Sequence, residues 1–479
     1  MKIFKLFIDE NIKTWKKLST KIMIIAIILS LFAVLTLVKF MEKTEENLLV
    51  YNSDNSTGEN EKEFLEREID FYESQLKNEK LDEETRLVTE RNLEMYKLYL
   101  EYDISPYNNT WENELVDYIV EQKINGQNTD ETLALLKNKN YNNYIEYQKK
   151  LLKQQLDNNT ISEQEYNDGL TILDLKEKYE IGKNYDQESY WKRNTIQKIE
   201  TAQNSLRTGI NKETNKLINA EEKKDLEDSI KLNMYRLENN IPDSNNGSNT
   251  NYRMRFELLA PMFSIAVISI AIIVIAGGTI SNEISTGTIK FWALTPNKRW
   301  KIMTAKLLSI LFYIIILVLI TSLLSVFIAN VFFAEDGETY LYCQNGEVKE
   351  IGNTLYTIEY YFVKAIPIVI FALFAVMLST ITRNTAVAVS FSVALYIGNG
   401  IAMQIINQFI TKDWVKFIPF NNLNLTTKIF PNATDMTSMM FGTNFATSTS
   451  LIFSLAVLGV CAFLMLVTMY DSFNKRDII

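Results

Sequence analysis

Long apolar runs occur near the start of this 479-residue chain and throughout its second half. A helix needs about 20 mostly apolar residues to cross a bilayer, and six runs meet or approach that length. They are residues 22–39, 258–282, 307–334, 365–382, 384–411 and a final run within 436–470. Apart from Lys39 at the end of the first run, they contain no Asp, Glu, Lys or Arg. Even the shortest run reaches about 27 Å as a helix, so the pattern predicts six transmembrane helices.

Residues 41–255 have a different pattern, with a net charge of roughly −15. Apolar side chains recur there at helical spacing, first as Leu65, Ile69, Tyr72 and Leu76 and later as Leu226, Ile230, Met234 and Leu237. Disorder is the alternative, but a disordered segment has too few apolar residues to bury. We therefore expect an all-α membrane protein in three parts: an amphipathic helix with the first span (1–40), a mainly helical extracytoplasmic domain (41–255), and a core of five spans (256–479).

Positive charges near the ends of the runs predict the orientation, because Lys and Arg accumulate on the cytoplasmic side of a membrane. If six spans alternate, all of these charges fall on one side: Lys2, Lys5, Lys13, Lys16, Lys17, Lys21, Lys290, Lys298, Arg299, Lys301, Lys306, Arg383, Lys475 and Arg476. We therefore expect both termini in the cytoplasm and residues 41–255 outside it.

Composition excludes several classes of function. The chain has no histidine and a net charge of −9, so a histidine zinc site and a Ser-His-Asp triad are ruled out, and nothing points to nucleic-acid binding. The scarcity of ionisable residues within the runs argues against a proton-coupled transporter. The phosphate-binding pattern G-x-x-x-x-G-K-[ST] is absent. We expect no enzyme activity and no directly bound cofactor, and if ATP drives this protein, the ATPase is a separate chain.

The polar segment between the second and third runs reads "SNEISTGTIKFWALTPNKRWKIMTAKLLS". It resembles the corresponding segment of type-2 ATP-binding-cassette (ABC) exporter permeases, in which an acid, Gly-Thr, a proline and basic residues lead into span 3. The matching positions are Glu283, Gly287, Thr288, Ile289, Pro296, Arg299 and Lys306. The segments "FKLFIDENIKTWKK", "FIPFNNLNL" and "FNKRDI" are similar to other parts of that family. The resemblance covers everything but the block 41–255, which simple members lack.

The resemblance implies that a separate ATPase subunit binds ATP and Mg²⁺, and that a short coupling helix docks into it. The implied coupling residues are Glu283, Gly287, Thr288, Lys290, Pro296, Arg299 and Arg383. Gly287 permits a sharp turn before this helix. The bases have an alternative interpretation, in which they only set topology and contact anionic lipid.

A second permease chain, identical or related, is also implied, since six spans are too few to enclose a pathway. Polar residues of the fifth run are the candidates for lining it: Ser390, Ser392, Asn399, Gln404 and Asn407. The alternative is hydrogen bonding between helices within one subunit.

The sequence thus favours the permease subunit of an ABC exporter in a bacterial plasma membrane. A second hypothesis is an ABC-type complex that transmits force to its outer domain without moving a substrate. A third is a membrane receptor without an ATPase partner.

Overall fold

A computed structural model describes residues 2–56, 61–77, 82–108, 110–184, 190–212, 216–242, 252–289, 298–334, 337, 339–344, 346–410, 413–430 and 449–475. The chain forms two compact units. The first unit contains residues 1–43, 250–342 and 349–479, and the second contains residues 44–249 and 343–348.

Six helices of the described chain are long and apolar enough to cross a membrane, which confirms the six predicted spans. They are α2 (Leu18–Ser56), α11 (Tyr252–Ser285), α13 (Arg299–Phe332), α14 (Asn353–Thr382), α15 (Thr385–Phe409) and α18 (Leu451–Lys475). A separate amphipathic helix, α1 (Lys2–Lys16), precedes them. Several of these helices extend beyond the apolar runs, because their ends carry polar and aromatic residues that pack on neighbouring elements.

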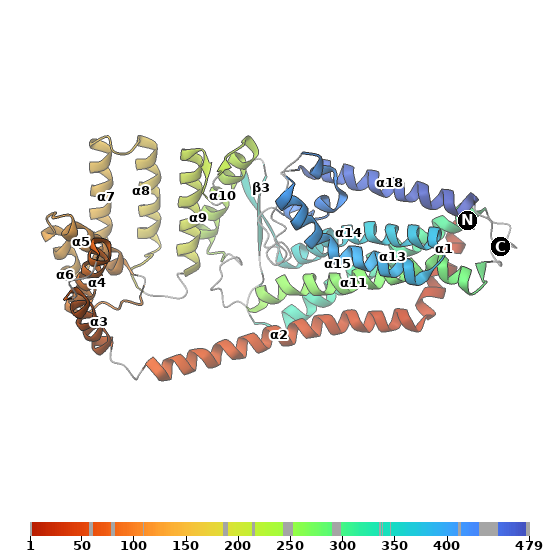
Figure 1. Cartoon of the computed structure of the whole chain (residues 1–479), viewed down its shortest axis with the longest axis horizontal. Helices are drawn as coiled ribbons and strands as arrows, with labels where there is room; N and C mark the ends of the chain where they lie inside the picture. Colours follow the sequence, from red (N-terminus) through yellow and green to blue (C-terminus); the bar gives the residue numbers. More distant parts are fainter. Residues whose placement is uncertain are drawn as a thin grey trace. The chain divides into compact units, whose positions relative to one another are not determined.

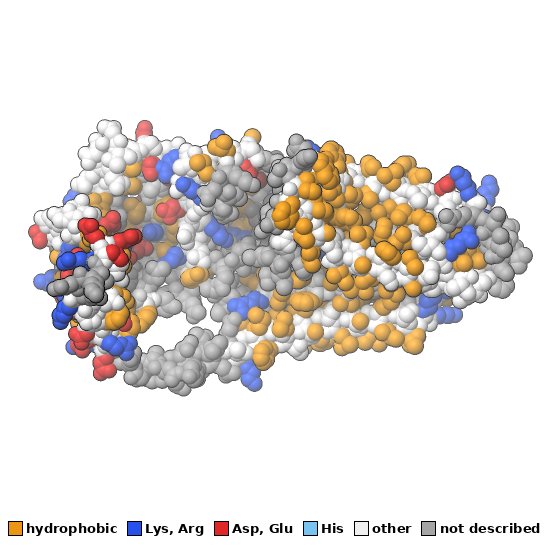
Figure 2. Space-filling model, viewed as in Figure 1, with side chains coloured by type: hydrophobic (Ala, Val, Ile, Leu, Met, Phe, Trp, Pro, Cys, Tyr) orange, Lys and Arg blue, Asp and Glu red, His pale blue; other side chains and the backbone are white. Residues whose placement is uncertain are grey.

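Helix α14 lies at the centre of the first unit and packs against α11, α13, α15 and α18. Figure 1 shows these helices running alongside one another. Their shared core is aliphatic and aromatic and includes Ile272, Tyr313, Phe371 and Val376. Hydrophobic side chains also cover the visible outer face of α15 and α18 (Figure 2). A helix that is apolar on all sides is typical of a membrane span.

Gly277 lets α11 and α15 approach closely. A methyl group added at this glycine would lie 2.7 Å from Cγ2 of Val389 on α15 and 3.5 Å from its Cα. Near this crossing the hydroxyl of Ser281 on α11 lies 2.8 Å from that of Thr385 on α15. Small residues at such crossings bring backbones together where the hydrophobic effect supplies little force.

Short elements connect the spans before α14 and after α15. A two-stranded sheet, β3 (Tyr340–Gln344) with β4 (Glu347–Ile351), precedes α14. The 3₁₀ helices η1 (Asp413–Phe417) and η2 (Pro419–Asn422) and the short α16 (Thr426–Ile429) follow α15. Rings of Tyr340, Tyr356, Tyr360 and Phe430 pack together there. The sequence pattern did not predict this hairpin, because neither strand alternates apolar and polar residues.

The second unit is helical, as predicted. Its helices are α3 (Glu61–Leu76), α4 (Glu83–Tyr102), α5 (Trp111–Ile124), α6 (Asp130–Asn138), α7 (Tyr141–Asp157), α8 (Glu163–Lys178), α9 (Tyr190–Thr208) and α10 (Ala220–Asn239). Helix α5 supplies the centre of one core, where Leu115, Val116, Ile119 and Val120 are fully buried. A short sheet, β1 (Ile210–Asn211) with β2 (Lys216–Leu217), was not expected.

Candidate functional site

Glu283 occupies the last turn of α11, and the residues after it end the helix. The hydroxyls of Ser285 and Thr286 donate to the carbonyl of Asn282, at 3.1 and 2.7 Å. Gly287 then turns the chain with a φ of 70°, a conformation that glycine adopts without strain. The turn expected at Gly287 is therefore present, and it leaves Glu283 at the end of the span.

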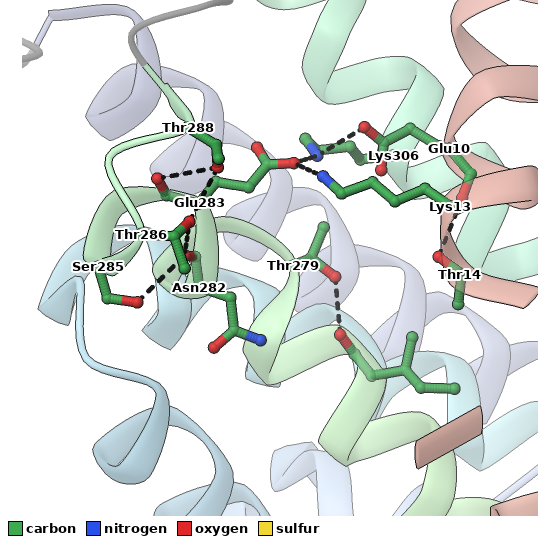
Figure 3. A network of polar contacts seen from close by, with 11 residues as sticks. Glu10, Lys13, Thr14, Thr279, Asn282, Glu283, Ser285, Thr286, Thr288 and Lys306 are labelled. Atoms are coloured by element: carbon green, nitrogen blue, oxygen red, sulfur yellow. Dashed lines mark hydrogen bonds and ion pairs between the residues drawn. The ribbon is translucent and has the colours of Figure 1, made fainter. Parts of the chain in front are cut away.

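The Glu283 side chain points inward, into a network of ion pairs (Figure 3). One of its carboxylate oxygens lies 2.8 Å from Nζ of Lys306 on α13, and the same oxygen pairs with Lys13 on α1. Lys306 also pairs with Glu10 on α1 at 2.9 Å. The side chain of Lys306 is 1% exposed, and those of Glu10 and Glu283 are 8% and 6% exposed. We call Glu10, Lys13, Glu283 and Lys306 the ion-pair cluster.

The charges of the ion-pair cluster compensate one another in a setting where an isolated charge would be costly. Burial lowers the pKa of Lys13, but its hydrogen bond to Glu283 and the nearby carboxylates outweigh this and leave the pKa raised. Lys13 therefore stays protonated at neutral pH. The cluster joins three helices that are remote in sequence.

Helix α1 is fixed on α13 by further contacts. The hydroxyl of Tyr313 donates to the carbonyl of Asn11 at 2.8 Å. Leu6 of α1 is buried against Ile302 and Ala305. Another side of α1 is apolar and exposed, with a stripe made of Phe4, Ile8, Ile12 and Trp15. This helix thus buries an acid and presents apolar side chains outward, as expected for a helix lying in a membrane interface.

The other residues of the expected coupling segment lie around the turn. Thr288 is exposed, and its hydroxyl donates to the carbonyl of Glu283 at 3.3 Å. Lys290 and Pro296 lie outside the described residues. The chain is described again from Lys298, directly before α13.

Arg299 and Arg383 lie at the same end of the first unit. Arg299 donates from Nη1 to the carbonyl of Asn474 in the last turn of α18, at 3.1 Å. Arg383 follows α14 in a left-handed conformation, and its backbone N–H donates to the carbonyl of Ser379. The hydroxyl of Ser379 accepts from the backbone N–H of Ser281 on α11, at 3.0 Å. The structure therefore brings the ends of α11, α14 and α18 and the start of α13 to one face.

The five candidate lining residues all lie on α15, but they do not converge. Ser390 and Gln404 are exposed. Ser392 is buried and donates to the carbonyl of Ala388. Asn407 exchanges two hydrogen bonds with Asn421, at 2.9 and 3.1 Å.

Asn399 donates to the carbonyl of Tyr396. Of the five, it is the one that lines a pocket of about 190 Å³ between α11, α14 and α15 among the described residues. Ser392 thus bonds within α15 and Asn407 bonds to the segment after it, and the five side chains do not share one pocket among the described residues.

Sequence reasoning missed the contribution of α1. It assigned Lys13 to topology and did not single out Glu10. The available signal was an acid within a lysine-rich amphipathic segment, at a position that helical spacing places beside Lys13 and Thr14.

Comparison with known proteins places this region in a wider group. Residues 229–479 match a family described as "Protein of unknown function (DUF2705)". The chain is 30% identical over 258 residues to the Bacillus subtilis "Uncharacterized protein YhcI", covering 52% of this chain and 76% of the relative. It is 29% identical over 208 residues to the "Uncharacterized membrane protein YdbK" of the same species, covering 43% of this chain and 76% of the relative. No solved structure matches. Glu283 and Lys306 lie within the family match, whereas Glu10 and Lys13 precede it.

Proposed function

The chain belongs to the DUF2705 family of multi-span membrane proteins, and from this premise we propose that it is the permease subunit of an ABC exporter. It lacks a phosphate-binding loop, so a separate ATPase subunit would hold ATP and Mg²⁺. A second permease chain would complete the transporter. The proposed location is a bacterial plasma membrane, with both termini in the cytoplasm.

The observation that carries this proposal is the ion-pair cluster behind the turn at Gly287. A force applied to the segment after α11 acts on Glu283, and Lys306 passes it directly to α13. Glu10 and Lys13 pass it to α1. A rigid connection of this kind suits a site where a partner's movement must reach several spans together.

Burial of Glu283 changes the role proposed for it. Its carboxylate faces the cluster, so Glu283 would position the coupling segment rather than touch the ATPase subunit. Thr288, Arg299 and Arg383 lie at the same face of the first unit and remain the proposed contacts, together with Lys290 and Pro296.

The position of the cluster also favours coupling over proton transport. A proton-carrying residue lies within the span and changes its charge during the cycle. Glu283 instead lies in the last turn of α11 and is shared between two cations, at 2.8 Å from Lys306. A carboxylate held between two cations suits a structural ion pair rather than the repeated uptake and release of a proton.

The test is to purify the tagged full-length chain from its own membranes in mild detergent and to measure ATP hydrolysis by the isolated complex. We expect a co-purifying ATPase subunit with a phosphate-binding loop. Glu283→Gln should lower the ATPase rate several-fold while the chain remains in the membrane. Asp471→Asn is the matched control, because Asp471 is an acid on α18 that is 55% exposed and pairs only with the neighbouring Lys475 in the described structure.

Two results would contradict the proposal. The first is purification of the intact chain without any ATP-hydrolysing partner. The second is an ATPase rate that changes equally in Glu283→Gln and Asp471→Asn, which would show that the ion-pair cluster has no specific part in coupling.

A further inference from the structure

A pocket of about 350 Å³ lies beside the ion-pair cluster, between α1, α11 and α13. Its volume falls in the range of sites for small molecules. Lys13 and Thr14 line it from α1, and Thr279 and Asn282 line it from α11 (Figure 3). Lys17, which follows α1, also lines it. The ion-pair cluster forms one wall of this pocket, but Lys17 and Ser309, which also line it, take no part in the cluster.

The pocket carries an excess of positive charge. Its charged lining residues are Lys13, Lys17 and Lys306 against Glu10 and Glu283. Lys13 and Lys306 take part in the ion-pair cluster, whereas the ammonium of Lys17 has no ion pair or hydrogen bond among the described residues. Lys17 is exposed at the edge of the pocket, and its pKa is lowered by partial desolvation and by the positive charges of Lys13 and Lys306, which outweigh the nearby carboxylates of Glu10 and Glu283. An anion in the pocket would offset this charge.

The pocket also holds a polar group that lacks a partner. Ser309 of α13 lines it and is 4% exposed. The Oγ atom of Ser309 is buried without a hydrogen-bond partner in the described part of the chain. A buried hydroxyl is normally satisfied by protein or by a bound molecule, and a hydroxyl beside surplus cations is suited to donate to an anionic oxygen.

If α1 lies in the membrane interface, as its exposed apolar stripe indicates, the pocket lies at the depth of lipid headgroups. The stripe of Phe4, Ile8, Ile12 and Trp15 is exposed along α1, and such a stripe inserts among the upper parts of acyl chains. The pocket lies against the same helix, and Ile275 and Ile310 add apolar surface to its lining. A ligand with an anionic head and an apolar continuation fits this arrangement better than a free anion does.

We propose that this pocket binds the phosphate group of an anionic phospholipid, with Lys17 as its main unshared cation. Basic pockets between spans at the cytoplasmic face can bind such headgroups. The bound phosphate would tie α1 to α11 and α13 through the same three elements as the ion-pair cluster. The proposal does not depend on an ATPase partner.

The experiment uses the delipidated full-length chain in mild detergent and native mass spectrometry. Phosphatidylglycerol is titrated against phosphatidylcholine, which has the same phosphodiester with a neutralising choline. Inorganic phosphate is titrated separately by calorimetry. The variant is Lys17→Gln, and the matched control is Lys16→Gln: both lysines are exposed, but only Lys17 lines the pocket. Lys17→Arg, which restores the charge, tests whether any loss comes from misfolding.

We expect Lys17→Gln to weaken phosphatidylglycerol binding about five-fold or more, the effect of one lysine near an anionic headgroup. Lys16→Gln and Lys17→Arg should stay within about two-fold of the unchanged chain. Equal binding of the two lipids would overturn the proposal, as would equal losses in Lys17→Gln and Lys16→Gln. If Lys17→Gln weakens only the binding of inorganic phosphate, the pocket takes a free anion and the lipid assignment is wrong.

Discussion

Replacing Lys306 by Met tests whether the ion-pair cluster holds the first unit together. Lys306 is 1% exposed and is the shared partner of Glu10 and Glu283, at 2.9 and 2.8 Å. Methionine fills a similar volume but leaves two carboxylates in a buried place. Breaking a buried pair from one side costs about 3–5 kcal/mol, so we expect the unfolding free energy to fall by that amount.

The other residues of the ion-pair cluster supply the control variants for Lys306→Met. Lys13 also pairs with Glu283, but its side chain is 44% exposed, so Lys13→Met should cost under about 1 kcal/mol. Combining Lys306→Met with Glu10→Gln and Glu283→Gln removes all three buried charges together. This variant should recover most of the lost stability, since contacting residues are strongly non-additive.

The assay is thermal unfolding of the full-length chain in detergent, followed by the fraction that remains monodisperse on size exclusion. For a unit of this size, the loss expected for Lys306→Met corresponds to roughly 6–20 °C. The reasoning is refuted if Lys306→Met unfolds at the same temperature as the unchanged chain. It is also refuted if Lys13→Met is as damaging as Lys306→Met, because burial would then not determine the cost.

Three further predictions follow from packing and capping, all measured as changes in unfolding of the full-length chain. Gly277→Ala should destabilise the first unit by about 1–3 kcal/mol, because the new methyl group meets Val389 at 2.7 Å; an unchanged transition would show that α15 moves freely. Leu115→Ala should cost about 2–5 kcal/mol, because Leu115 is 0% exposed, and limited proteolysis should then cut the second unit first. Ser162→Ala should cost about 1 kcal/mol, since the Ser162 hydroxyl accepts from the N–H of Glu165 at 3.2 Å at the start of α8. A cost near zero would show that this cap does not stabilise the helix.

The six spans could be predicted because lipid imposes a length and a composition on each of them. Their ends were harder to predict. Helix α14 begins at Asn353 rather than at 365, since Tyr356 and Tyr360 pack on Tyr340 and Phe430. This packing depends on a hairpin and a distant segment, which hydropathy does not reveal.

In the candidate site, too, features encoded locally could be predicted, and features that depend on distant contacts could not. Glu283, Gly287 and Lys306 could be named from one short stretch of sequence. The direction of the Glu283 side chain could not, because it depends on the packing of α1, α11 and α13, which brings together Lys306 and Lys13, the latter 270 positions away in the chain. Contacts of such sequence separation leave no local pattern in a single sequence.

The ion-pair cluster also determines when helix α1 can reach its native contacts during synthesis. Glu10 and Lys306 are 296 positions apart, and chains are synthesised at about 5–20 residues per second. Helix α1 therefore exists for roughly 15–60 s before its buried partner is made. Throughout that time α1 is held at the membrane surface by its exposed apolar stripe and by the adjoining span α2. Helix α1 thus gains its buried ion pair only once the start of α13 has been synthesised, and the interval before that is when this segment is most open to proteases.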